Sequence, residues 1–92
     1  MVYVLGKLKL ESYDKWKSVF DERAIMRREG GGYEAHIFRN FENPNEVVIL
    51  FKWHNLEDAR MYFESESVQK TLKNAGAKEI EITYLDEIAK TI

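Results

Sequence analysis

The side chains of this chain best suited to acid–base chemistry near neutral pH are its two histidines. His36 lies in the middle of a predicted strand, where it could serve as a general acid or base; a position on an edge strand within a dimer interface explains it equally well. His54 directly precedes Asn55, which is predicted to cap a helix, and is interpreted as a solvent-exposed residue at a strand end. His36 is therefore the candidate catalytic residue.

Other catalytic and metal-binding patterns are missing from the sequence. There is no cysteine, which excludes a disulfide, a thiolate nucleophile and a zinc–thiolate site. The histidines are far apart in the chain, and no HExxH spacing, carboxylate pair or Ser-His-Asp set stands out. We therefore predict no metal site and no cofactor.

Large aromatic side chains recur at positions that are predicted to face the interior. Such side chains can line an apolar pocket and stack on a planar substrate, or they can simply fill the core. Both interpretations stay open here. The candidate ligand-binding residues are Trp16, Phe20, Phe51, Trp53 and Phe63.

The composition is typical of a small globular protein, and we predict one domain over residues 1–92. Hydrophobic residues make up 45% and aromatic residues 13%, which is enough for a packed core. Fourteen basic and 16 acidic residues give a net charge of -2 without a basic patch, so nucleic acid is not an expected partner. No apolar run approaches the roughly 20 residues that span a bilayer, and no secretory pattern is found, so we predict a cytoplasmic protein without membrane contact.

Alternation of apolar and polar residues predicts four strands. The strand-like segments are residues 3–10, 33–41, 46–53 and 78–85. The second and third are joined by a short turn around Pro44, which predicts an antiparallel hairpin.

Two helical regions separate these strands. Apolar residues at three-to-four-residue spacing predict one helix of about four turns over residues 13–28, capped by Ser12, with Arg27 continuing the apolar stripe. Three consecutive glycines end this helix: Gly30, Gly31 and Gly32. Asn55 caps a second helix over residues 56–63, and a short helical turn follows over residues 68–75.

The element order β-α-β-β-α-β predicts a ferredoxin-like α+β fold. Right-handed crossovers place the first and third strands at the centre, which gives a four-stranded antiparallel sheet of order 4-1-3-2 with the helices on one face. The first and fourth strands are then neighbours. Lys7 and Lys9 on the first strand and Glu79 and Glu81 on the fourth are therefore expected to form cross-strand ion pairs.

The strand over residues 46–53 is apolar on both of its faces, yet the helices cover only one face of the sheet. Apolar side chains therefore remain at the centre of the open face. Patches of this kind usually mark an interface. We predict an isologous homodimer in which two open sheet faces pack together.

The element order, with the strand VVILFKW running into the helical segment NLEDARMYFESESVQKTL, resembles the dimeric alpha-beta barrel superfamily. Within it, the chain is similar to the antibiotic biosynthesis monooxygenase-like proteins. This resemblance implies a dimeric alpha-beta barrel. It also implies relatives that include cofactor-independent oxygenases of aromatic polyketides, haem-degrading monooxygenases and small proteins without known activity.

The haem-degrading branch of that family carries an Asn on the first strand, a Trp at the end of the third strand and a haem-ligating His on the second helix. Trp53 matches the Trp. The Asn position falls at or beside Gly6, and the His position falls on Phe63, which cannot ligate iron. Haem degradation is therefore not expected.

Two functional hypotheses follow. In the first, the chain is a homodimeric small-molecule-binding domain that acts like a cofactor-independent monooxygenase on an aromatic or quinone-like compound, with His36 as the proton acceptor. In the second, it is a non-catalytic dimeric interaction or ligand-sensing module. An open pocket that holds a ring favours the first hypothesis, and a cleft filled by aromatic side chains favours the second.

Overall fold

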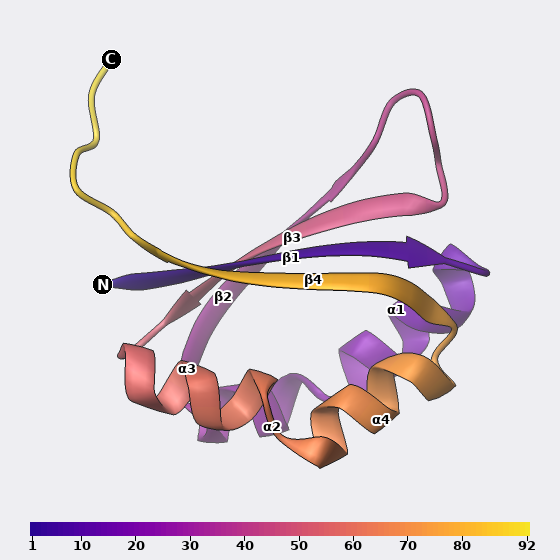
Figure 1. Cartoon of the computed structure of the whole chain (residues 1–92), viewed down its shortest axis with the longest axis horizontal. Helices are drawn as coiled ribbons and strands as arrows, with labels where there is room; N and C mark the ends of the chain where they lie inside the picture. Colours follow the sequence, from indigo (N-terminus) through magenta and orange to yellow (C-terminus); the bar gives the residue numbers. More distant parts are fainter.

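The computed structural model describes all residues from Met1 to Ile92. The strands are β1 (Val2–Leu10), β2 (Gly32–Arg39), β3 (Glu46–Trp53) and β4 (Ala77–Asp86). The helices are α1 (Tyr13–Glu22), α2 (Ala24–Glu29), α3 (Leu56–Phe63) and α4 (Glu66–Asn74). The strands form one sheet of order β2-β3-β1-β4 in which every neighbouring pair is antiparallel. All helices lie on one side of this sheet and leave the other face uncovered (Figure 1). This arrangement confirms the predicted ferredoxin-like α+β fold and its strand order.

The predicted four-turn helix is in fact two helices, α1 and α2, separated at Arg23. The backbone of Arg23 has φ -95° and ψ 10°, which departs from α-helical geometry. Beside this break, the Phe20 carbonyl accepts a hydrogen bond of 2.8 Å from the guanidinium Nη1 of Arg27. The apolar spacing continues across the break, so periodicity alone did not predict it.

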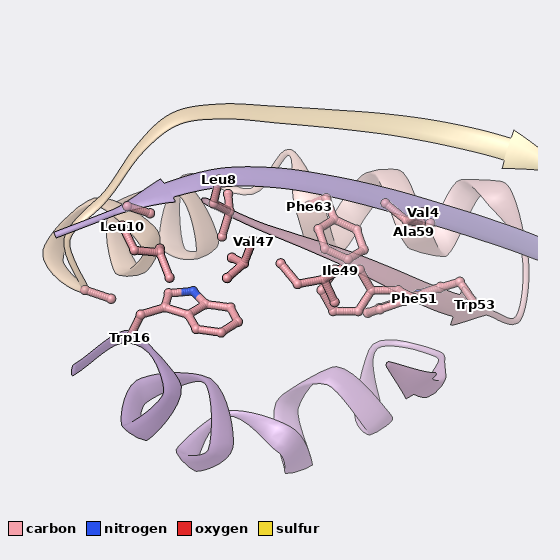
Figure 2. Close-up of a cluster of buried hydrophobic side chains, with 12 residues drawn as sticks. Val4, Leu8, Leu10, Trp16, Val47, Ile49, Phe51, Trp53, Ala59 and Phe63 are labelled. Carbon is pink, nitrogen blue, oxygen red and sulfur yellow. The ribbon is translucent and has the colours of Figure 1, made fainter. Parts of the chain in front are cut away.

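The core lies between the sheet and the helices. On β3, alternate residues point toward the helices and are almost fully buried: Val47, Ile49, Phe51 and Trp53. Trp16 reaches from α1 toward the sheet and Phe63 from α3 (Figure 2). The helix side of β3 is thereby the centre of the core, and its burial is the main source of stability.

Side-chain caps fix where three of the helices begin. Ser12 accepts from the amide of Lys15 at 3.3 Å, and Asn55 accepts from the amide of Asp58 at 2.8 Å. Both caps were predicted from the sequence. Ser65 caps α4 in the same way, which explains why the chain breaks between α3 and α4 and then resumes as a helix.

The predicted ion pairs between β1 and β4 are confirmed in part. Lys9 pairs with Glu79 at 2.7 Å. Lys7 lies opposite Glu81 in the strand register, but its ion pair is formed with Glu46 of β3 at 3.6 Å. Apart from Glu46, these charged side chains are more than half exposed, so the pairs favour the register more than they add stability.

The glycines before β2 do more than end a helix. The indole Nε1 of Trp53 donates to the Gly30 carbonyl at 2.9 Å, and Gly31 adopts φ 110°, which favours glycine. A Cβ atom at Gly32 would lie 2.9 Å from the Trp53 ring. The glycine run therefore gives Trp53 both its hydrogen-bond acceptor and the space for its ring.

Tyr84 connects β4 to α3, because its hydroxyl donates to a Glu64 carboxylate oxygen at 2.9 Å. Burial, followed by this hydrogen bond, raises the pKa of Tyr84 to about 12. The unfolded chain loses the same proton near pH ~10. Stability is therefore expected to fall as the pH rises from that value toward the folded-state pKa of about 12.

Ultraviolet titration of the phenols, taken as wild type minus Tyr84→Phe, measures this pKa directly. The difference curve should be centred near 12, and Glu64→Gln should move it downward. A difference curve with an ordinary tyrosine pKa would contradict the assignment.

Candidate functional site

An apolar cavity lies between the sheet and the two helix pairs, α1 with α2 and α3 with α4. It contains about 60 Å³ of free volume, and about 570 Å³ when all empty space in and around it, open solvent included, is counted. The sheet contributes Gly6, Leu8, Ile49, Phe51 and Ile82 to the lining. The first helix pair contributes Trp16, Val19, Phe20, Arg23 and Arg27. The second helix pair and its ends contribute Tyr62, Phe63, Val68, Thr71, Leu72 and Ala75. A ring-sized ligand would have to occupy the mouth as well as the inner space.

Four of the five aromatic candidates lie in the wall of this cavity: Trp16, Phe20, Phe51 and Phe63. The rings of Trp16 and Phe20 are 4.9 Å apart between centroids, and so are the rings of Phe51 and Phe63. The fifth candidate, Trp53, is outside the wall. It is fully buried, with its ring 4.8 Å from that of Phe63, and it supports the wall from behind.

Gly6 leaves a gap in the sheet floor of the cavity. A Cβ atom at this position would lie 3.6 Å from Ile82 and 3.7 Å from Phe51, both ordinary van der Waals distances. A side chain at Gly6 would therefore fit and occupy part of the cavity. From the sequence, Gly6 was considered only as a position on the first strand. Its contribution to a cavity could not be predicted, because the cavity is formed by side chains from several strands and helices together.

Arg27 is one of the two charged residues that line the cavity, with Arg23, and sequence reasoning did not select it as a site residue. Its guanidinium lies over the Phe20 ring, 3.7 Å from the centroid, and is half-buried. Burial lowers the pKa of Arg27 below its usual value. The sequence did carry a signal for Arg27, because this charged residue lies on the predicted apolar stripe of the helix. Charged residues are rarely found at core positions, so such a residue is a candidate for a specific role.

The structure does not bring the histidines into the cavity. His36 projects from β2 on the open sheet face, opposite Leu50 in the register, with its Nε2 atom 3.9 Å from Glu34. His54 forms a 2.9 Å hydrogen bond through Nδ1 with the Tyr33 hydroxyl at an exposed position. No cluster of three or more potential metal ligands is found, and none of the helices has the length and apolar character to cross a bilayer.

The open face of the sheet carries a band of apolar side chains. The strand registers align His36, Leu50, Leu5 and Thr83 in one row across the sheet. The rows on either side combine large apolar residues with charged ones. The apolar residues are Tyr3, Phe38, Val48 and Leu85, and the charged residues are Lys7, Glu34, Lys52 and Glu81. Phe38 and Leu85 are 54% and 41% exposed, so this band has no cover within the chain.

No protein-family model and no curated protein sequence matches the chain. Solved structures do match over almost its whole length. SnoaB, described as a cofactor-independent oxygenase from Streptomyces nogalater, aligns with a TM-score of 0.77 at 14% identity, covering 97% of this chain and 94% of that one. A Deinococcus radiodurans protein classed with the antibiotic biosynthesis monooxygenases aligns with a TM-score of 0.70 at 20% identity, covering 100% and 96%. A Bordetella bronchiseptica protein of the same class aligns with a TM-score of 0.76 at 9% identity, covering 96% and 97%.

The chain shares the ferredoxin-like fold of these solved structures. This finding supports the resemblance seen in the sequence, and at these identities it concerns the fold. Within this fold, two of the positions compared with the haem-degrading pattern, Gly6 and Phe63, line the same cavity, whereas Trp53 lies behind it. Neither of the two lining residues offers a ligand atom for iron.

Proposed function

We propose that this chain is a single-domain homodimeric protein that binds a small aromatic or quinone-like compound in the manner of a cofactor-independent monooxygenase. The observation that carries the proposal is the cavity, whose wall contains Trp16, Phe20, Phe51 and Phe63 and is mostly hydrophobic. Apolar clefts with aromatic walls and a few polar groups are typical small-molecule sites. The likeness in fold to SnoaB adds support, because that protein is described as a cofactor-independent oxygenase.

The chain's own contribution to such a reaction would be to hold the ring and to exclude water around it. Rings of the substrate can stack against the Phe20 and Phe63 side chains, which come from opposite helix pairs. A water-poor environment strengthens every electrostatic interaction within it. Arg27 is the cation that such an environment would bring closest to the ring.

The homodimer is part of the same proposal. The apolar band on the open face needs a cover, and a second copy of the sheet offers the same apolar surface in return. In such a dimer His36 would lie in the interface rather than at the cavity, since its row also contains Leu50 and Leu5. His36 could therefore act as the proton acceptor only if the second copy of the chain placed a ligand next to it.

Gly6→Val tests the cavity. Valine fits a strand and its methyl groups would fill the floor beside Ile82 and Phe51. A library of aromatic compounds is screened by thermal shift against the wild-type protein, and the affinity of each hit is measured for both proteins. We expect Gly6→Val to weaken binding by about tenfold or more, since occupied space removes most of the ligand's contacts.

Leu5→Val is the matched control, because Leu5 is on the same strand and points to the open face. Hits should bind this variant as they bind the wild type. If Gly6→Val keeps full affinity for every hit, the cavity is not the binding site.

The second hypothesis, a non-catalytic dimeric ligand-sensing or interaction module, is favoured by one observation. The cavity wall contains no histidine and no carboxylate, so it offers no ordinary general base. Oxygen uptake with a bound aromatic compound separates the two hypotheses. Tight binding without turnover supports the sensing module, and compound-dependent oxygen uptake that Gly6→Val reduces supports the oxygenase.

A further inference from the structure

The guanidinium of Arg27 is held in one place at the edge of the cavity. It stacks on the Phe20 ring at 3.7 Å, and its Nη1 donates to the Phe20 carbonyl at 2.8 Å. This bond uses one of several N–H donors of the guanidinium, and the Tyr62 side chain is a second hydrogen-bonding neighbour, so donors remain for a further partner. A fixed cation with free donors is well suited to bind an anion, because little conformational entropy is lost on binding.

Arg27 forms no ion pair within the structure, although the charge of Asp21 acts on it from a greater distance. Neither Arg27 nor Arg23, which lies one turn earlier and lines the same cavity, takes part in any ion pair of the structure. Asp21 is paired with Lys17 at 2.7 Å. Glu34 lines a neighbouring hollow with Arg27 and Arg28, and its carboxylate lies 3.9 Å from Nε2 of His36. The residues that line the cavity thus include two arginines and no acidic residue, although the chain as a whole carries a net charge of -2.

The position of Arg27 makes its charged form less favourable than in water, as the lowered pKa of its guanidinium indicates. Burial, opposed by Tyr62 and Asp21 and reinforced by Arg23, lowers its pKa from the usual value. A half-buried cation beside a second cation is unfavourable unless an anion compensates it. The break between α1 and α2 gives a structural reason for the hydrogen bond from Arg27 to the Phe20 carbonyl. It gives no structural reason for placing Arg23 and Arg27 close together.

We propose that the ligand of the cavity is an aromatic carboxylic acid, whose ring enters the apolar space and whose carboxylate binds Arg27 and Arg23. The inference rests on the proposed function, because it assigns a ligand class to the same cavity. Arg27 and Arg23 are partly exposed, whereas Trp16, Phe51 and Phe63 are buried. The ring therefore lies inward and the carboxylate at the mouth, where guanidinium groups form strong charge-assisted hydrogen bonds.

The test compares each acid with its neutral isostere. Benzoate and 2-naphthoate are titrated against benzamide and 2-naphthamide by calorimetry with the wild-type protein. We expect the acids to bind tighter than the amides by on the order of ten- to a hundredfold, the usual range for a hydrogen-bonded charge pair. Added salt should reduce the preference.

Arg27→Gln should remove most of this preference, because it lowers the affinity for the acids much more than the affinity for the amides. Arg28→Gln is the matched control, because Arg28 is the next residue on α2, is exposed and does not line the cavity. This variant should keep the preference. A purely structural role of Arg27 would lower the affinities for acid and amide together.

The outcomes separate the two proposals. If acids and amides bind the wild type equally well, the anion inference is overturned and the cavity remains a binding site. If Arg27→Gln folds and keeps the preference, the inference is also overturned. If neither acids nor amides bind, the proposed function fails together with the inference. The wild-type comparison needs no substitution, so a variant that fails to fold does not prevent the test.

Discussion

Replacing Trp53 with alanine is expected to lower the free energy of unfolding by about 3–5 kcal/mol, the range for large aromatic residues removed from a core. Trp53 is fully buried, and its ring lies 4.8 Å from Phe63 and 5.1 Å from Tyr62. The substitution also leaves the Gly30 carbonyl without its indole donor. For a domain of this size such a loss is a large part of a total stability of about 5–15 kcal/mol.

Urea unfolding followed by circular dichroism measures this change. Trp53→Phe separates the two contributions, because it keeps most of the packing and loses the hydrogen bond to Gly30. Phe41→Ala is the matched aromatic-to-alanine control, since Phe41 is fully exposed, and should change stability by less than about 0.5 kcal/mol. A Trp53→Ala protein as stable as this control would disprove the supporting role of Trp53.

Leu50→Glu is expected to separate the proposed homodimer. Leu50 lies in the row at the centre of the open face, next to Leu5 of β1. Two-fold symmetry would bring two new carboxylates into an apolar interface at once. Like charges in an interface cost several kcal/mol, so the dimer dissociation constant should rise by on the order of a thousandfold.

Sedimentation velocity at micromolar concentration measures the association state. Leu56→Glu is the matched control, because it makes the same substitution at an exposed position in the first turn of α3, away from the open face. The control should stay dimeric and the variant should be monomeric and folded. A wild-type protein that sediments as a stable monomer would remove the dimer from the proposal.

Much of the fold could be predicted because local signals and tertiary structure agree. The boundaries of β3 were predicted from an apolar run that ends where Asn55 caps a helix, and the structure has the same boundaries, Glu46–Trp53. Strand order followed from the handedness of the crossovers, which depends on element order alone. Strand boundaries and strand order can therefore be predicted without knowing which side chains contact one another.

The candidate site was less predictable because it is a property of several elements at once. Alternation along β3 places Phe51 and Trp53 on the same face, and both were predicted to contact a ligand. Of the two, only Phe51 lines the cavity between the helix pairs. The position of this cavity depends on the break at Arg23 and on the missing side chain of Gly6. The role of Arg27 depends on the same break.

The position of β1 at the centre of the sheet has a consequence for how the chain is made. β1 pairs with β3 in the register Val2 to Trp53 and with β4 in the register Val2 to Asp86. One of its two edges is therefore completed by a strand that begins 67 residues after β1 ends, since β1 ends at Leu10 and β4 begins at Ala77. During synthesis that edge stays free until β4 has left the ribosome. An unpaired strand edge can pair with other chains. The nascent chain therefore depends on the late, long-range docking of β4, which predicts folding slower than that of a helical bundle of equal length.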